Sequence, residues 1–225
     1  MIRSLAKVGG NTLLSRVLGF VRDLVLARVF GADGTTDAFF VAFKIPNFLR
    51  RLFAEGAFAV AFVPVLTEYK TTRGFRDLKT FVDHVAGTLG LVLLAVSVLG
   101  VVAAPVLIAV FAPGWAYHGA EQVGLATELL RLTFPYLLFI SLTAFAGGIL
   151  NAHDRFGVPA FTPVLLNLCL IAGALWLAPR LQTPILALGW SVLIAGIAQF
   201  AFQLPFLHRL RLMPRFTPAW RDPGV

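Results

Sequence analysis

Charged residues are scarce in this sequence. Asp, Glu, Lys and Arg together make up 13% of its 225 residues, whereas hydrophobic residues make up 58%. A soluble domain carries roughly a quarter charged residues, which solvate its surface. So little charge cannot cover a globule of this length, and the apolar surface that remains has to face lipid. The composition therefore excludes an ordinary soluble domain and indicates a membrane protein.

Charge is missing altogether from four long stretches. These lie between Asp83 and Glu121, between Arg131 and Asp154, between Arg155 and Arg180, and between Arg180 and Arg209. Each reaches the roughly 20 residues that an α-helix needs to cross the hydrocarbon of a bilayer. The short segments of alternating polarity that mark an outer-membrane barrel are absent. We therefore predict an all-α, polytopic membrane protein.

Cysteine and metal-ligand patterns are also lacking. Cys169 is the only cysteine and lies in an apolar run, so no intrachain disulfide can form. The four histidines are scattered without metal-ligand spacing, and we expect neither a metal nor a cofactor. Arg16, Arg22 and Asp23 interrupt the N-terminal apolar stretch, which is not the clean core of a cleavable signal peptide.

Turn residues divide the chain into six predicted spans. Their expected ranges are about 5–30, 36–67, 82–111, 124–151, 158–178 and 184–207, which together form one transmembrane lobe over residues 1–207. The second span contains several charges, but either half alone is too short to cross a bilayer. We therefore expect one long helix there, kinked near Pro46. Residues 208–225 are expected to be a cytoplasmic basic linker that stops before a second lobe.

Basic residues predict the orientation of these spans. One set of connections carries most of them, namely Arg3, Lys7, Lys70, Arg73, Arg76, Lys79, Arg155, Arg209, Arg211, Arg215 and Arg221. The alternate connections, 31–35, 112–123 and 179–183, carry only Arg180. Because cytoplasmic loops are enriched in Lys and Arg, both chain ends should be cytoplasmic. The same distribution argues against a nucleic-acid partner despite the net charge of +8.

The first two spans nevertheless hold charges inside the membrane. The nine charges there are Arg16, Arg22, Asp23, Arg28, Asp37, Lys44, Arg50, Arg51 and Glu55. Each would cost roughly 2.5–3.5 kcal/mol if it faced lipid at the bilayer centre, so they have to pair or line a hydrated cavity. Six are positive and three are negative. This excess of positive charge calls for an anionic ligand, and the planar fork of arginine suits a diphosphate.

Helical spacing groups some of these charges on shared faces. Asp37, Lys44 and Arg51 repeat every seven residues, and Glu55 follows Arg51 at i+4, all within an arc of roughly 40°. Arg16 and Asp23 are also seven apart. Arg22 and Arg50 point elsewhere and need partners of their own. An alternative for the acidic residues is that Asp23 and Glu55 simply neutralise neighbouring arginines.

Long motifs in the first two spans resemble one known family. They are Ser15–Asp23 (SRVLGFVRD), Thr36–Asn47 (TDAFFVAFKIPN) and Leu49–Phe58 (LRRLFAEGAF). Phe134-Pro135-Tyr136, Gly148–Asn151, Pro159–Phe161 and Leu166-Asn167 continue the similarity along the chain. The sequence resembles the MurJ (MviN) family of bacterial lipid II flippases, within the multidrug/oligosaccharidyl-lipid/polysaccharide exporter superfamily.

The resemblance implies two six-helix lobes around a central cavity, with two additional helices. Such a protein carries lipid II, an undecaprenyl-diphosphate-linked disaccharide-pentapeptide, from the cytoplasmic to the periplasmic leaflet of the inner membrane for peptidoglycan synthesis. It would do so by alternating access. Because the family is about twice as long, this chain would be the N-terminal lobe, and the C-terminal lobe its missing partner.

The resemblance also implies roles for individual residues. Arg16, Arg22 and Arg51 match cavity arginines of the family, Asp37 is an accompanying acidic position, and Arg50 lies in the same doublet as Arg51. We therefore expect substrate binding by Arg16, Arg22, Arg50, Arg51 and Asp37. Supporting ion pairs or gating are expected from Asp23, Lys44 and Glu55.

Three other classes remain open from sequence. An ion-coupled drug or polysaccharide-lipid exporter of the same superfamily is one, although a net-positive cavity does not suit cationic drugs. A membrane-embedded polyprenyl-phosphate transferase is another, and it would need clustered Asp, Glu or His for metal binding or acid–base chemistry. A scaffold protein would leave the cost of the intramembrane charges unexplained. The sequence favours a transporter over an enzyme.

Overall fold

The computed structural model describes residues 2–31, 33–51, 58–115 and 120–217. Within these ranges every regular element is a helix, which confirms the all-α class. The helices are α1 (Ile2–Phe30), α2 (Gly34–Arg50), α3 (Phe58–Thr72), α4 (Phe75–Val102), α5 (Ala104–Phe111), α7 (Ala120–Thr133), α8 (Tyr136–Ala152), α9 (Gly157–Ala172) and α10 (Leu186–Arg209). A π-helical turn and a 3₁₀ turn extend α9 to Arg180.

Four helical segments of the described chain are long and apolar enough to cross a membrane. They are Phe75–Val102, Ala120–Ala152, Gly157–Arg180 and Leu186–Arg209. Each overlaps one of the predicted spans three to six. The protein is therefore a multi-pass membrane protein. With 29 residues, α1 is as long as these segments, but its charges keep it out of this apolar set.

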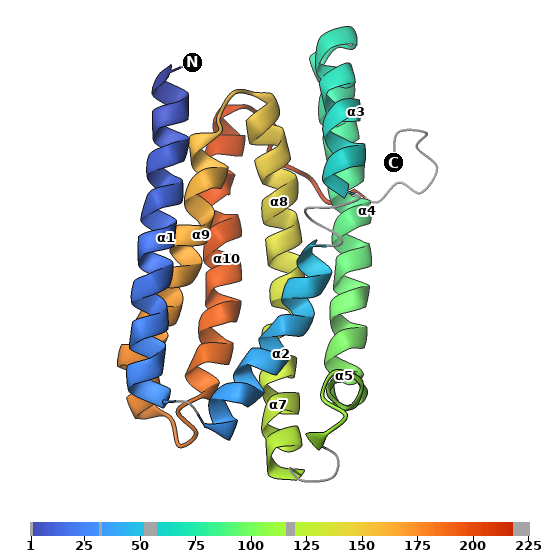
Figure 1. The fold of residues 1–225 in the computed structure, drawn as a ribbon. Helices are drawn as coiled ribbons and strands as arrows, with labels where there is room; N and C mark the ends of the chain where they lie inside the picture. Colours follow the sequence, from blue (N-terminus) through green and yellow to red (C-terminus); the bar gives the residue numbers. More distant parts are fainter. Residues whose placement is uncertain (1, 32, 52–57, 116–119, 218–225) are drawn as a thin grey trace.

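The described residues of the predicted second span form two helical segments, one before and one after residues 52–57. In Figure 1, α2 rises from the end of the molecule where α1 finishes, and α3 continues toward the opposite end. Their 17 and 15 residues correspond to about 25 Å and 22 Å, so neither alone crosses roughly 30 Å of hydrocarbon. Helix α2 continues through Pro46 to Arg50. Residues 52–57, including Glu55, lie outside the described part.

Proline positions explain two further joints. The predicted span over 82–111 is too long, because α4 ends at Val102 and the short α5 starts in a new direction (Figure 1). Pro105 lies in the first turn of α5, where its missing N–H costs nothing. Between α7 and α8, Pro135 precedes Tyr136 and interrupts the fourth span. Proline cannot donate the i→i−4 hydrogen bond, which is why the helices break there.

Tight packing surrounds the α7–α8 joint. Phe134, at the α7–α8 joint, is 2% exposed and belongs to a buried cluster with Phe39, Leu130 and Leu137. A Cβ added to Gly100 of α4 would lie 2.0 Å from the Phe134 ring. The absence of a side chain at Gly100 therefore lets α4 approach the joint closely.

The first helix starts on the same side of the bundle as the last helix ends. In Figure 1 the start of α1 and the end of α10 are at the same end of the molecule, as an even number of crossings requires. Beyond α10 the chain packs against α4. Leu212 is fully buried, and the Arg215 backbone N–H donates to Asp83 Oδ1 at 2.7 Å. Asp83 also pairs with Lys79 one turn earlier.

Candidate substrate cavity

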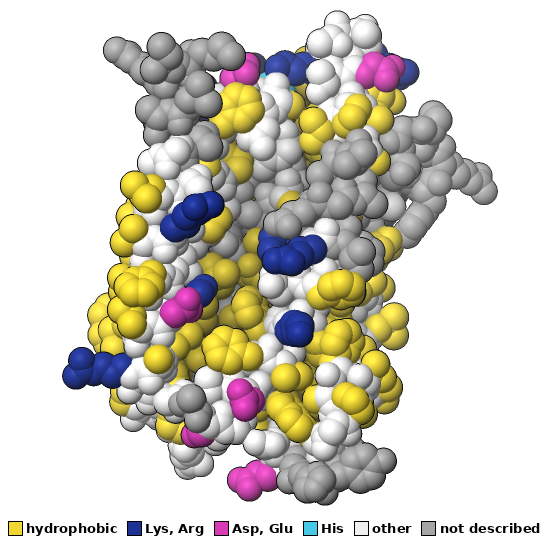
Figure 2. All heavy atoms as spheres, in the orientation of Figure 1, with side chains coloured by type: hydrophobic (Ala, Val, Ile, Leu, Met, Phe, Trp, Pro, Cys, Tyr) yellow, Lys and Arg dark blue, Asp and Glu magenta, His cyan; other side chains and the backbone are white. Residues whose placement is uncertain are grey.

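A cavity of about 700 Å³ lies within the bundle. Side chains from α1, α2, α3, α8, α9 and α10 line it, so it is built by elements far apart in sequence. Its polar lining residues are Arg22, Asn47, Arg50, Tyr136, Thr143, Asn151, Thr162, Gln199 and Gln203. Figure 2 shows a mainly apolar recess on this face, with Lys and Arg side chains on both sides of it.

Arg22 reaches this cavity from α1. Its Nη1 donates to Asn167 Oδ1 at 2.9 Å, and its Nε and Nη2 donate to Asp23 Oδ1 at 3.0 and 2.8 Å. Asn167, on α9, also donates from Nδ2 to the Ser15 carbonyl of α1 at 3.1 Å. One buried asparagine therefore ties α1 to α9 and holds the guanidinium at the cavity wall. Asp23 neutralises its neighbour Arg22, as the alternative for this carboxylate predicted.

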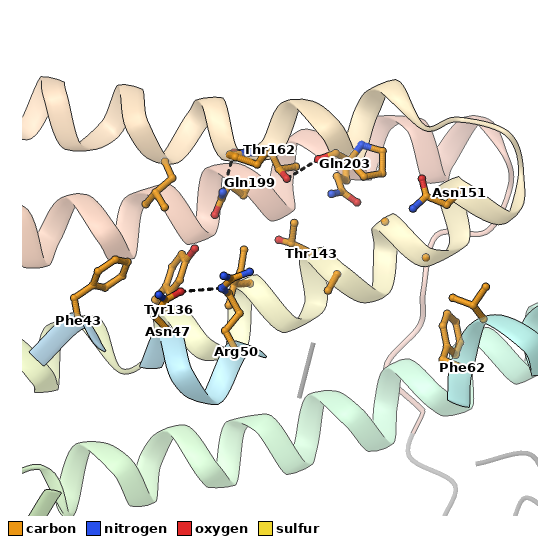
Figure 3. A pocket seen from close by; sticks show the side chains of 18 of the residues that line it. Phe43, Asn47, Arg50, Phe62, Tyr136, Thr143, Asn151, Thr162, Gln199 and Gln203 are labelled. Carbon is orange, nitrogen blue, oxygen red and sulfur yellow. Dashed lines mark hydrogen bonds between the residues drawn. The ribbon is translucent and has the colours of Figure 1, made fainter. Parts of the chain in front are cut away.

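Arg50 reaches the cavity from the last turn of α2. Its Nε donates to Asn47 Oδ1 at 3.0 Å, and Figure 3 shows the guanidinium between Asn47 and Thr143. Both Asn47 and Arg50 line the cavity, since a spacing of three residues brings them to one face of α2. The helix thus presents an oriented cation to the enclosed space.

The charge lining the cavity is therefore positive. Arg22 and Arg50 line it, and its lining within the described residues includes neither Asp nor Glu. Asp23 lies beside Arg22, but 63% of the Asp23 side chain is exposed and it does not line the cavity. A cavity of this kind can hold an anion and offer each guanidinium fork to its oxygens.

Neutral polar groups from α10 complete the wall. Gln199 and Gln203 are spaced by four residues and are 2% and 1% exposed. Gln199 Nε2 donates to the Thr162 carbonyl of α9 at 2.8 Å. Figure 3 shows both glutamines directed into the space that Thr143 and Arg50 face. These residues were not among the predicted site residues, although two glutamines at i, i+4 in an otherwise apolar span were a usable signal.

The other predicted site residues lie elsewhere. Arg16, Asp37, Lys44 and Arg51 are exposed and do not belong to the lining of this cavity. The face shared by Asp37, Lys44 and Arg51 is therefore not the one that lines the cavity. Arg22 and Arg50, which the helical spacing set apart from the shared faces, are the ones that line it. Glu55 lies outside the described residues.

The described residues contain no cluster of three or more His, Cys, Asp or Glu side chains that could hold a metal ion. The polar chemistry of the described cavity comes from guanidinium, amide and hydroxyl groups.

Comparison with known proteins gives one consistent result. The family model described as "Lipid II flippase MurJ" matches residues 26–225. A probable lipid II flippase MurJ from Haemophilus influenzae is 47% identical over 223 residues, which cover 95% of this chain and 43% of that protein. The lipid II flippase MurJ of Burkholderia cenocepacia is 45% identical over 229 residues, covering all of this chain and 44% of that protein.

A solved structure agrees with these sequence relatives. "Lipid II flippase MurJ, inward closed conformation" matches with a TM-score of 0.71 and 29% identity, over 92% of this chain and 45% of that one. This chain thus spans less than half the length of the relatives it matches. Since the family model covers most of its residues and the fold agrees, the chain belongs to the MurJ family.

Proposed function

We propose that this chain is the N-terminal lobe of an inner-membrane lipid II flippase, a transporter rather than an enzyme. The complete protein carries the undecaprenyl-diphosphate-linked precursor of peptidoglycan from the cytoplasmic to the periplasmic leaflet. Family membership supports this proposal, together with the names of the relatives. The remaining length of those relatives supplies a second lobe, against which this one moves in alternating access.

The observation that carries the proposal is the pair of arginines in the cavity. Arg22 and Arg50 approach it from two different helices, and the lining has no carboxylate among the described residues. A diphosphate offers several anionic oxygens in a compact group, which two guanidinium forks can bind bidentately. A cationic drug, by contrast, would meet repulsion in this space.

Orientation follows from the distribution of basic residues. Lys70, Arg73, Arg155 and Arg209 lie in or next to connections at the end of the molecule where α1 starts and α10 ends (Figure 1). Excess positive charge is retained on the cytoplasmic side of bacterial membranes, so this end is assigned to the cytoplasm. Lipid II is made available on that side, and the cavity accepts it there.

The proposal is tested by measuring lipid II exposure at the outer face of flippase-depleted cells. The cells express the complete gene, unaltered or with Arg22→Ala, Arg50→Ala or Arg50→Lys, at matched protein levels. We expect exposure to fall at least tenfold with either alanine variant. Arg50→Lys should restore only part of it, since lysine keeps the charge but loses the planar fork.

Arg180→Ala is the matched control, because Arg180 is exposed and lies outside the cavity lining. Full exposure with both alanine variants would remove the arginines from the binding site. No exposure with the unaltered gene would reject the flippase and favour an exporter of another substrate.

A further inference from the structure

The α10 side of the cavity carries hydrogen-bond acceptors whose needs are not met. Gln199 Oε1 and Gln203 Oε1 are buried and find no hydrogen-bond partner within the described residues. A buried amide carbonyl without a partner is destabilising, so native structures rarely keep one without a reason. Here two occur one helical turn apart, and both residues line the same cavity.

The neighbouring hydroxyl groups are acceptors as well. Thr143 Oγ1 donates its proton to the Phe139 carbonyl at 2.7 Å, and Thr162 Oγ1 donates to the Pro159 carbonyl at 2.8 Å. A hydroxyl has one proton and two lone pairs, so each oxygen can now only accept. Gln199, Gln203, Thr143 and Thr162 together form what we call the acceptor wall.

Helix packing explains only half of this arrangement. Gln199 Nε2 donates to the Thr162 carbonyl and so ties α10 to α9, which is an ordinary use of glutamine between membrane helices. That bond uses the donor end of the amide. The side-chain carbonyl groups of Gln199 and Gln203 make no hydrogen bond to the described residues and so have no structural role there.

The two sides of the cavity are therefore chemically complementary to each other. Guanidinium groups only donate hydrogen bonds, so a ligand that binds Arg22 and Arg50 has to offer acceptors to them. The acceptor wall requires donors. A molecule that satisfies both sides carries anionic oxygens at one end and neutral O–H or N–H groups a short distance away, as a sugar diphosphate does.

We propose that Gln199 and Gln203 bind the hydroxyl and acetamido N–H groups of the glycan that is attached to the diphosphate. This assignment rests on the proposed function and deepens it. The arginines hold the charge common to all polyprenyl diphosphates, and the acceptor wall distinguishes a lipid that bears the sugars from one that does not. Figure 3 shows the glutamines and Arg50 on different sides of the enclosed space.

The test measures binding to the purified full-length protein in detergent with two probes. One is undecaprenyl diphosphate, and the other is the same lipid carrying the disaccharide without the peptide. The readout is the ratio of the two affinities. We expect the double substitution Gln199→Leu/Gln203→Leu to lower the preference for the disaccharide lipid about tenfold or more. Arg50→Ala should weaken both probes and change the ratio little.

Two further variants keep the test decisive. Ser191→Ala is the matched control, because Ser191 is a buried polar residue of α10 outside the cavity lining. If the double variant does not fold, Gln203→Met keeps the Gln199–Thr162 bond and should lower the ratio about threefold.

The possible outcomes separate this inference from the proposed function. An unchanged ratio, or equal weakening of both probes, would overturn the acceptor wall and leave the flippase in place. No preference between the two probes in the unaltered protein would also overturn the acceptor wall and leave the flippase in place. If the unaltered protein binds neither probe, the proposed function is rejected and this inference with it. The same holds if Arg50→Ala leaves the affinity for both probes unchanged.

Discussion

At the scale of single residues, the two cavity arginines are held differently. Arg22 shares its donors between a carboxylate, Asp23, and the amide of Asn167. Arg50 is oriented by Asn47, one turn earlier on its own helix. Part of the charge of Arg22 is thus compensated before any ligand arrives. A neighbouring helix contributes to the position of Arg22 through Asn167, and Asn47 contributes to the position of Arg50 from within α2.

Asn167 gives a direct test of this dependence. The substitution Asn167→Ala removes the acceptor of Arg22 Nη1 and the bond to the Ser15 carbonyl. A hydrogen bond to a charged group contributes about 1.5–3 kcal/mol, so the guanidinium should lose its fixed position. We expect lipid II exposure between that of the unaltered protein and that of Arg22→Ala, measured in depleted cells at matched protein levels.

Cys169→Ala serves as the control for this substitution. Cys169 is half-buried on the same helix and does not line the cavity, so exposure should be unchanged. Full exposure with Asn167→Ala would show that Arg22 needs no partner on α9.

The site could be predicted from sequence only in part. The unbalanced positive charge pointed to an anion, and Arg22 and Arg50 do line the cavity. The regular spacing of Asp37, Lys44 and Arg51 pointed to a different face, because periodicity shows which residues share a side and not which side is enclosed. The glutamines were missed, since neutral amides do not disturb charge or hydropathy patterns and acquire meaning only when the surrounding helices are placed.

At the scale of helices, the charge-free runs located the crossings but not their joints. Residue composition changes little at Ala103 or Phe134, so hydropathy predicted continuous spans there. The local cause is proline, at Pro105 and Pro135, and at the α7–α8 joint it is combined with the close packing of Phe134 against Gly100. Pro46 shows why proline alone is an ambiguous signal, because α2 continues through it.

Gly100 provides a test of packing at the α7–α8 joint. A Cβ at this position would lie 2.0 Å from the ring of Phe134, which is 2% exposed and has no room to move. Overpacking of this kind typically costs 1–3 kcal/mol. We therefore expect Gly100→Ala to lower the Tm of the purified full-length protein by several degrees.

The matched substitution is Gly124→Ala, in the middle of α7. A Cβ there meets nothing within 4 Å, and alanine favours a helix by about 0.5–1 kcal/mol over glycine. Its Tm should stay the same or rise. Equal Tm values for both variants would mean that the Gly100–Phe134 contact does not hold the joint.

The start of α2 depends on a polar cap in the connection after α1. Asp33 Oδ1 accepts from the Thr35 hydroxyl at 2.7 Å and from the backbone N–H groups of Thr35 and Thr36 at 3.0 and 3.1 Å. The bond from the Thr35 hydroxyl, followed by the one from the Thr36 N–H, lowers the pKa of this carboxyl. Asp33→Ala should therefore reduce Tm at neutral pH.

The pH dependence of that effect has a definite sign. Because the pKa of Asp33 is lowered by folding, the cap stabilises the folded protein at any pH above the pKa of the unfolded chain, about 3.9. This contribution is lost as the pH falls through the lower pKa of the folded protein. The Tm difference between the unaltered protein and Asp33→Ala should stay constant from pH 5 to 8 and shrink in stronger acid. If the Tm difference varied between pH 5 and 8, its pH dependence would come from another titratable group.

At the scale of the whole molecule, the described chain resembles half of a transporter. Six helices line its cavity, while α1 and α4 keep long apolar faces exposed, including Phe20, Leu24, Leu94 and Leu99. Relatives of this chain are more than twice as long. In alternating access a substrate passes between two lobes that rock against each other, so a single lobe can bind a ligand but has nothing to close against.

We therefore predict that the 225 residues alone insert into the membrane but do not transport. Their apolar spans satisfy the requirements of insertion, and Arg22 and Arg50 remain in place to bind a diphosphate. Expressed in flippase-depleted cells, the 225-residue chain should restore neither growth nor lipid II exposure, while the complete gene restores both. Membrane fractionation at matched abundance controls for failed insertion. Growth restored by these residues alone would show that one lobe suffices, for instance as a pair of identical copies.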